Sequence, residues 1–380
     1  MSINLPSTSL PRVVIAGGGF AGLKLAQELD SSLFQIVLID HHNYHQFPPL
    51  IYQVASSGLE PSSIAFPFRA AFKRKKNFIF RLANVIGVNH EDKQLITSVG
   101  EVPYDYLILA CGGTTNYFGN EQIAKHSLPM KTLYESMNLR NVLLQNIEKA
   151  LVSDRPETRE ALLTVAIVGG GPSGVEIAGA LAEMKRYVLP KDYPYMEIDQ
   201  FKIHLIDASP RLLQAMSEKS SRTATKGLTE LGVEIHHNTM VTDYDGRVLT
   251  LGDGTKMNTR TVIWVSGIVA NTVEGIQADT LGRGKRILVD GYNEVQGYPN
   301  IFALGDQCLM TADPAYPQGH PQMAQVAIQQ AALLAKNLKA RLSGKAQRTF
   351  HYKDLGSMAT IGRNLAVAEI GKAKWGGFTA

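Results

Sequence analysis

Cysteine is scarce in this sequence of 380 residues, and the two that occur, Cys111 and Cys308, lie far apart. They supply neither a disulfide framework nor a cysteine-based metal site, and they fit a reducing, cytosolic compartment. Long apolar runs are also absent, because no stretch reaches the roughly 18 residues that a membrane span needs. The N-terminus lacks the charged and apolar regions of a signal peptide. The sequence therefore predicts a protein without a membrane span.

Neither positive nor negative charge is in large excess, since the formal net charge is only +4. The densest basic run, residues 69–76, predicts a solvated surface segment, with contact to anionic lipid as the alternative. Nucleic acid is not expected as a partner, because no aromatic platform or recognition motif accompanies this run. Three histidines, His41, His42 and His45, lie close together, but prolines follow them and we expect no acidic partner nearby. We therefore predict no metal site.

What the sequence does contain is a glycine loop between a strand and a helix. The apolar run Val13–Ala16 leads into Gly17, Gly19 and Gly22, and apolar residues then return at helical spacing. In this G-x-G-x-x-G pattern the first glycine allows the turn, the second lets the backbone approach a pyrophosphate, and the third lets helix pack on strand. The N-terminus of the helix offers free N–H groups and the positive end of the helix dipole to a phosphate.

The acid that such a motif requires is also present. A second apolar run ends in Asp40, close to the offset at which a carboxylate holds a ribose hydroxyl pair. Strand, glycine turn, helix and acid together predict a dinucleotide site.

The same pattern returns in the middle of the chain. A strand over residues 163–168 leads into Gly169, Gly171 and Gly174, and a strand over 201–206 ends in Asp207. Two such units imply two dinucleotides. Asp207 favours a free ribose 2′-hydroxyl and hence NADH over NADPH, although nearby Arg211 leaves NADPH open.

Other segments predict further elements of an α/β protein with two or three domains. The pattern predicts strands over residues 78–90, 94–97, 104–110 and 261–265, helices over 133–151 and 323–338, a polar connection over 154–160, and an antiparallel layer that contains 233–236 and 247–251.

Several motifs, taken in order, resemble the two-dinucleotide flavoprotein oxidoreductases. They are the first glycine loop followed by LILACGG, IVGGGPSGVEIAGALAE, VIWVSGI and NIFALGDQ, at residues 107–113, 167–183, 262–268 and 300–307. The resemblance implies two Rossmann-like domains, with FAD in the first site and NADH in the second, and a short C-terminal β segment. It also implies that Asp306 contacts FAD.

Three further stretches, residues 44–69, 321–338 and 354–369, narrow the match. They resemble type II NADH:quinone dehydrogenases, which are single-subunit flavoproteins that do not pump protons, and the resemblance covers about residues 10–378. It implies an FAD domain from 1–126 and 293–345, an inserted NADH domain from 127–292, and a C-terminal segment from 346–380. That segment ends before the family's membrane-interface helices.

The resemblance also implies a location and partners. We expect peripheral attachment to the cytoplasmic side of the cell membrane, weakened without those helices, so that this 380-residue form is soluble. A quinone, menaquinone or ubiquinone, is the expected acceptor. Homodimers occur in the family, but the sequence carries no diagnostic interface signal.

The resemblance assigns roles to named residues. In the family the A-Q-x-x-x-Q segment lines the quinone site against the flavin. Expected quinone-site residues are Gln325, Gln329, Pro48 and Gln53. Expected cofactor-binding residues are Gly17, Gly18, Gly19, Phe20, Ala21, Gly22, Asp40, His41, Val85, Ala110, Gly112, Gly305, Asp306, Ala324, Gln325, Gly169, Gly171, Pro172, Ser173, Gly174, Asp207 and Gly267.

Glu176 is the candidate for proton transfer. It lies in the first turn after the second glycine loop, where the helix dipole favours a carboxylate whatever its function. In the family the matching glutamate is implicated in quinone binding or proton transfer. The overall prediction is an NADH:quinone oxidoreductase. The alternatives are an NADH-dependent flavoprotein reductase with another acceptor, or an NADH-sensing flavoprotein that acts by binding a partner.

The scarcity of cysteine decides among relatives. Flavin disulfide reductases carry a C-x-x-x-x-C pair soon after the first site, whereas residues 46–58 contain no cysteine. Sulfide:quinone reductases need reactive cysteines beyond the first domain. Cys111 and Cys308 fit neither chemistry well.

Overall fold

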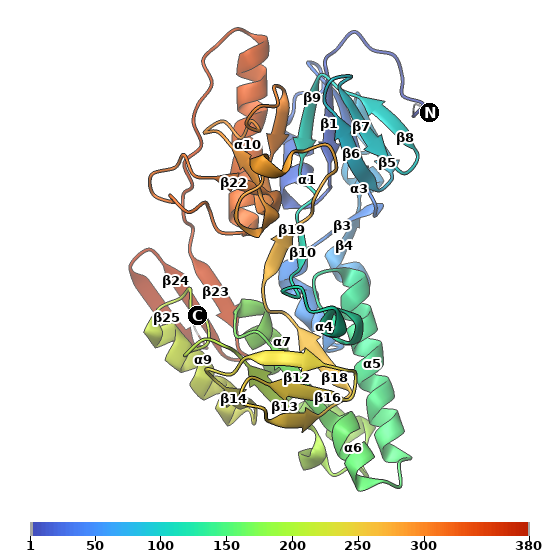
Figure 1. The fold of residues 1–380 in the computed structure, drawn as a ribbon, viewed down its shortest axis with the longest axis vertical. Helices are drawn as coiled ribbons and strands as arrows, with labels where there is room; N and C mark the ends of the chain where they lie inside the picture. Colours follow the sequence, from blue (N-terminus) through green and yellow to red (C-terminus); the bar gives the residue numbers. More distant parts are fainter. Residues whose placement is uncertain (1–2, 379–380) are drawn as a thin grey trace. The chain divides into compact units, whose positions relative to one another are not determined.

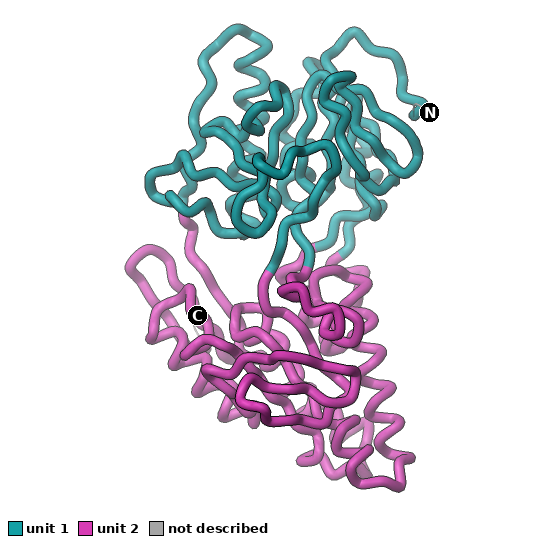
Figure 2. The backbone as a smooth tube through the Cα atoms, viewed as in Figure 1, with its two compact units in different colours: residues 1–46, 65–114, 268–353 teal, residues 47–64, 115–267, 354–380 magenta. Residues whose placement is uncertain are grey.

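The structure is a computed structural model that describes residues 3–378. The chain forms two compact units, drawn in different colours in Figure 2. Unit 1 contains residues 1–46, 65–114 and 268–353, and unit 2 contains residues 47–64, 115–267 and 354–380. Each unit is therefore assembled from segments that lie far apart in the sequence.

Unit 1 is built on a five-stranded parallel sheet of order β21-β9-β1-β2-β5 (Figure 1). Its central strand β1 is buried from Val13 to Ala16, as expected of a parallel strand covered on both faces. The strands are β1 (Arg12–Ala16), β2 (Gln35–Asp40), β5 (Phe78–Leu82), β9 (Tyr106–Leu109) and β21 (Ile301–Ala303).

Two helices cover one face of this sheet. Helix α1 (Phe20–Glu28) packs against α10 (Ala324–Leu342), and their apolar residues form a core cluster with the strands. The amphipathic pattern therefore predicted α10 correctly.

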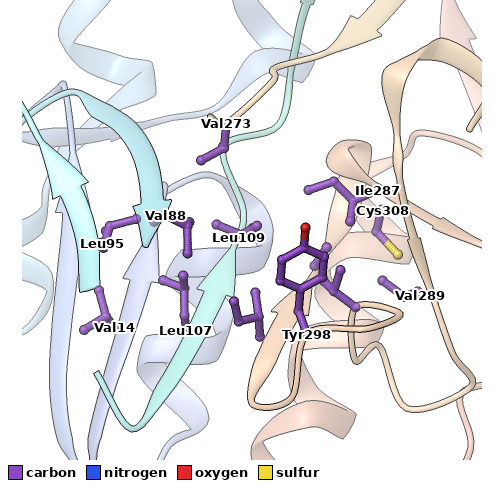
Figure 3. Close-up of a cluster of buried hydrophobic side chains, with 14 of the residues drawn as sticks. Val14, Val88, Leu95, Leu107, Leu109, Val273, Ile287, Val289, Tyr298 and Cys308 are labelled. Carbon is purple, nitrogen blue, oxygen red and sulfur yellow. The ribbon is translucent and has the colours of Figure 1, made fainter. Parts of the chain in front are cut away.

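An antiparallel layer of β6 (Val85–Asn89), β7 (Gln94–Thr97) and β8 (Gly100–Pro103) contributes to a second cluster. In Figure 3 the side chains of β9 lie between those of this layer and those of residues 287–310.

One strand prediction in unit 1 was wrong. Residues 78–90 form two strands, because β5 pairs in parallel with β2 whereas β6 pairs antiparallel with β7. Hydrophobic alternation does not reveal a change of partner. The remaining short elements of unit 1 are β3 (Tyr44–Gln46), β4 (Ala65–Pro67), α3 (Phe68–Ala71), β20 (Ile287–Val289) and β22 (Cys308–Met310), while β10 (Gly113–Thr115) pairs with β19 (Ile268–Ala270).

Unit 2 repeats the parallel sheet in the order β11-β18-β12-β13-β14. Its strands are β11 (Leu128–Pro129), β12 (Thr164–Val168), β13 (Lys202–Ile206), β14 (Glu234–His236) and β18 (Thr261–Trp264). Its other elements are α2 (Ile51–Ala55), α4 (Glu121–His126), α5 (Leu133–Leu151), α6 (Pro156–Leu163), α7 (Pro172–Glu183), α8 (Leu189–Asp192), α9 (Glu218–Glu230), β15 (Val241–Tyr244), β16 (Val248–Leu251) and β17 (Lys256–Asn258).

Two predictions in unit 2 need correction. Residues 154–160 were expected to form a polar connection, but α6 begins at Pro156, whose missing N–H suits the first helical position. Strand β14 was assigned to an antiparallel layer, but it pairs in parallel with β13. A strand of only three residues shows too little alternation for the sequence to distinguish a parallel partner from an antiparallel one. Strand β16 does belong to an antiparallel layer, with β15 and β17.

The C-terminal part of unit 2 is an antiparallel sheet of β23 (Ser357–Thr360), β24 (Ala366–Ile370) and β25 (Ala373–Gly377). It packs closely on α7 and α9. A Cβ on Gly179 of α7 would lie 2.5 Å from the backbone nitrogen of Gly362. The Glu369 carboxylate accepts hydrogen bonds from the N–H of Ser217 and the hydroxyl of Ser220 at the N-terminus of α9.

Replacing Gly179 by alanine is expected to lower the free energy of unfolding by about 1–2 kcal/mol, because overpacking outweighs the gain in helix propensity. The colliding atoms are backbone and cannot rotate away. Urea unfolding of the purified protein measures the change. Gly58→Ala is the matched control, since its Cβ would meet nothing closer than 3.5 Å. Unchanged stability of Gly179→Ala would contradict this packing.

Among the described residues, no helix is long and apolar enough to cross a membrane.

Candidate functional site

The first and third glycines of the loop after β1 are required by the protein itself. Gly17 has a φ of +105°, and a Cβ there would lie 2.3 Å from the carbonyl oxygen of Ala110. A Cβ on Gly22 would lie 1.8 Å from the carbonyl oxygen of Gly17. These contacts close the turn and bring α1 against β1.

The central glycine of this loop is different. A Cβ on Gly19 would meet no atom of the protein within 4 Å, and the backbone there is extended, with a φ of −66°. Neither packing nor conformation explains this glycine. Gly19 is also the N-cap of α1, and no side chain caps that helix. The loop therefore leaves open space beside an uncapped helix N-terminus, which fits the pyrophosphate of a dinucleotide.

The loop after β12 in unit 2 repeats this arrangement. Gly169 has a φ of +120°, and its Cβ would lie 2.9 Å from the backbone nitrogen of Ser266. A Cβ on Gly174 would lie 1.8 Å from the carbonyl oxygen of Gly169, whereas one on Gly171 would meet nothing within 4 Å. Gly171 likewise begins a helix, α7, that no side chain caps. Unit 2 thus has a second place that fits a pyrophosphate.

An aspartate closes each loop in the same way. The Asp40 carboxylate accepts hydrogen bonds from the N–H of Gly18 at 2.6 Å and of His42 at 2.7 Å. The Asp207 carboxylate accepts from the N–H of Gly170 and of Ser209. Each carboxylate oxygen has more than one lone pair, so both acids keep acceptor capacity for ribose hydroxyls.

Arg211 was the residue that left NADPH open. Its guanidinium donates to the carbonyl oxygens of Leu213 and Gln214, at 3.4 and 2.8 Å. These bonds hold the Arg211 side chain on its own loop.

The other expected cofactor residues surround the ends of the strands in each unit. In unit 1, Val85 begins β6, Ala110 and Gly112 follow β9, Gly305 and Asp306 follow β21, and Ala324 begins α10. In unit 2, Pro172 and Ser173 begin α7, and Gly267 follows β18. Phe20 and Ala21 begin α1. The carboxyl edge of each parallel sheet is where such folds bind ligands.

The surroundings of His41 and His42 correct one expectation. Asp40 lies close to both imidazoles, with its Oδ1 3.6 Å from Nδ1 of His41, so an acidic partner is present. The two N–H bonds that Asp40 accepts fix this carboxylate on the glycine loop. His45 is buried, and its Nδ1 bonds the carbonyl oxygen of Gly18 at 2.9 Å.

Glu176 belongs to a polar cluster within unit 2. Burial raises the pKa of Glu176 to about 8, and a hydrogen bond from the backbone of Thr360 on β23 partly opposes this. The Thr360 hydroxyl contacts the hydroxyl of Tyr52 at 2.9 Å, and the Gln53 amide donates to that same Tyr52 oxygen at 3.1 Å. The Glu176 carboxyl, which is mostly protonated at neutral pH, therefore contacts the backbone of a residue whose own hydroxyl bonds Tyr52.

The two glutamines of α10 are anchored within unit 1. The Tyr352 hydroxyl donates to Oε1 of Gln325 at 3.0 Å. The Gln329 amide bonds both backbone groups of Lys353, donating to its oxygen at 2.8 Å and accepting from its N–H at 3.1 Å. Gln329 is therefore engaged with the backbone. Pro48 and Gln53 belong to unit 2.

Comparison with known proteins decides the family. A sequence model of the pyridine nucleotide-disulphide oxidoreductases matches residues 11–331. The type II NADH:quinone oxidoreductase Ndh of Mycobacterium tuberculosis is 36% identical over 97% of this chain and 81% of its own. This chain belongs to the type II NADH:quinone oxidoreductases.

More distant relatives agree with this placement. The external alternative NADH-ubiquinone oxidoreductase of Yarrowia lipolytica is 28% identical, over 98% of this chain and 75% of its own. The structure of NDH2 from Plasmodium falciparum in complex with NADH superposes with a TM-score of 0.88 at 22% identity, covering 97% of this chain and 91% of that one. The fold expected from the sequence, an α/β pair of dinucleotide-binding units, is confirmed.

The cysteines of this type II oxidoreductase do not suit the disulphide chemistry in the wider family's name. Burial raises the pKa of the Cys111 thiol to about 12 and that of Cys308 to about 11. A thiol with so high a pKa forms little thiolate, which is the nucleophile in disulfide exchange.

Sequence reasoning missed three residues of these clusters, namely Tyr52, Tyr352 and Thr360. Tyr52 and Thr360 lie in stretches that carry the family resemblance, but nothing in the spacing of these three residues points to the partners that they contact in the structure. Only the packing of the folded units reveals their roles.

Proposed function

We propose that this protein oxidises NADH and reduces a membrane quinone through a bound FAD, without pumping protons. The observation that carries the proposal is the duplicated glycine loop. Gly19 and Gly171 are the two loop glycines that the protein's own packing does not require, and each opens an uncapped helix N-terminus. Family membership supports the quinone as acceptor.

Unit 1 is proposed to hold FAD and unit 2 to hold NADH. FAD, when bound, supplies the redox chemistry by taking a hydride from NADH and giving two electrons to a quinone. The protein positions the groups around it. The first glycine loop and Asp40 would hold the pyrophosphate and adenosine ribose of FAD, and the second loop and Asp207 those of NADH.

Glu176 is the proposed source of a proton. Reduction of a quinone to a quinol consumes two protons, and Glu176 carries one at neutral pH because burial raises its pKa to about 8. Thr360, Tyr52 and Gln53 hold hydroxyl and amide groups near this carboxyl within unit 2. Gln325, oriented by Tyr352, is proposed to contact the quinone.

The attachment of the protein is part of the same proposal. We place it on the cytoplasmic side of the cell membrane as a peripheral protein. Arg69, Lys73, Arg74 and Lys76 are exposed, and Phe66 nearby in the sequence is 56% exposed, a combination that suits an anionic lipid surface. Sedimentation with anionic and neutral vesicles tests attachment, and light scattering tests whether the protein forms the homodimer that we also propose.

Anaerobic stopped-flow spectroscopy tests the proposed reaction. The purified protein should be yellow, should bleach rapidly with NADH and slowly with NADPH, and should recover its colour with a menaquinone or ubiquinone analogue. Bleaching without recovery would remove quinone reduction as the function of this chain. A colourless protein that also fails to take up added FAD would contradict the whole proposal.

A further inference from the structure

Three potential metal ligands lie on the paired strands β13 and β14 of unit 2. His204 and Glu234 are direct partners in the parallel register, and His236 follows Glu234 by two residues on the same face. Nδ1 of His204 lies 3.1 Å from Nε2 of His236 and 3.4 Å from Oε2 of Glu234. One ligand atom from each residue thus lies within 4.8 Å of the other two.

The two separations measured from His204 match those between ligands in a tetrahedral metal site. Zinc binds histidine nitrogen and carboxylate oxygen at about 2.0–2.2 Å, which places neighbouring ligand atoms about 3.3 Å apart. Two imidazole nitrogens and one carboxylate oxygen are the donor set of several three-ligand zinc sites, in which water takes the fourth position.

The surroundings allow an ion to enter from solvent, and they leave the Glu234 carboxylate to balance its charge. The His204 side chain is 9% exposed, whereas that of Glu234, on the edge strand β14, is 58% exposed, so the cluster opens to solvent at this edge of the sheet. Lys202, on the same face of β13, is paired with Glu160 at 2.9 Å.

We propose that His204, Glu234 and His236 form a binding site for a divalent transition-metal ion of the zinc class, with water in the open position. None of these three residues is among those proposed to bind the quinone. It departs from the sequence prediction of no metal, which weighed only His41, His42 and His45. At that first cluster Asp40 already accepts two backbone N–H bonds, whereas Glu234 accepts none that is described.

A bound ion would join the edge strand to its neighbour. The carbonyl oxygen of His236 accepts a hydrogen bond from the N–H of Asp207 at 2.9 Å. The metal would therefore fix the strand that supports the proposed ribose-binding carboxylate. Because the metal would bind the folded chain but not the unfolded chain, it should also raise the melting temperature of the protein.

The experiment is a Co²⁺ titration of the metal-free holoprotein, prepared without a histidine tag. Wild-type protein is expected to develop the visible absorption bands of tetrahedral Co²⁺, and Zn²⁺ should displace them. His236→Ala and Glu234→Gln should each weaken binding by about tenfold or more. Zn²⁺ should raise the melting temperature of the wild type and have less effect on either variant.

His237→Ala is the matched control, since it removes the next imidazole along the chain, whose Nδ1 has no described hydrogen-bond partner. It should bind Co²⁺ like the wild type. Folding of each variant is checked by circular dichroism and retained flavin. If the wild type shows no tetrahedral Co²⁺ bands, or if His236→Ala keeps them, the imidazoles form only a hydrogen bond to each other and the proposal fails.

Discussion

Gly171→Val should raise the KM for NADH by about 100-fold while the protein keeps its flavin and its stability. The side chain would project into space where the protein has no atom within 4 Å, and the extended backbone there, with φ −74° and ψ −176°, suits valine. Valine is also compatible with the proline that follows. The proposed pyrophosphate of NADH would then lose its close approach to the loop, and displacements of about 1 Å can cost roughly 100-fold.

The neighbouring glycines separate binding from folding. Gly174→Ala should lower the free energy of unfolding, because its Cβ would lie 1.8 Å from the carbonyl oxygen of Gly169. Gly19→Val, at the equivalent position in unit 1, should lose FAD rather than affinity for NADH. Steady-state kinetics, flavin content and urea unfolding measure the three effects. If Gly171→Val left the KM unchanged, the second loop would not be the NADH site.

Both loops were predictable from the sequence, because local chemistry dictates them. The first and third glycines of each loop stand where a Cβ would overlap backbone, and the spacing between strand and helix fixes those positions. The two acids were also predictable, because Asp40 ends and Asp207 follows a strand that pairs directly with the strand before the loop. The positions of all these residues follow from segments of fewer than about 50 residues.

What could not be predicted depends on long-range packing. Glu176, Thr360 and Tyr52 meet only because α2, β23 and α7 pack together. His204 faces Glu234 only because β14 pairs in parallel with β13. The sequence around β14 was consistent with an antiparallel partner, so the cluster could not be anticipated. Periodicity determines which face a residue lies on, but pairing determines what it faces.

Glu176→Gln should slow the reoxidation of reduced flavin by quinone by about 100-fold or more, which is the usual contribution of general acid catalysis. Flavin reduction by NADH should be unaffected. Glutamine keeps the size and the acceptor oxygen for the Thr360 N–H but cannot give up a proton. Stopped-flow measurement of the two half-reactions separates these effects.

Glu183→Gln is the matched control on the same helix. The Glu183 carboxylate accepts a hydrogen bond from the N–H of Arg363, and glutamine retains an oxygen for that bond. Both half-reactions should stay at the wild-type rate in this variant. A similar loss in both variants would indicate a structural effect on α7 rather than proton transfer.

The pH dependence of the rate of quinone reduction gives a second test of the role of Glu176. Because its pKa is raised from 4.5 to about 8, the carboxyl group is protonated below about pH 8 and charged above it. The rate of quinone reduction by the wild type should therefore fall as pH rises through 8, whereas Glu176→Gln should lack that decline.

The same pKa shift makes a prediction about stability. The folded protein binds this proton more tightly than the unfolded chain does. The carboxyl group therefore lowers the free energy of unfolding progressively as pH rises from about 4.5 to 8, and the full loss remains above that range. Glu176→Gln removes the cost of burying a charge, and it should melt at a higher temperature than the wild type at pH 8.5. A variant that is less active and yet more stable would identify Glu176 as a group kept for its proton rather than for the fold.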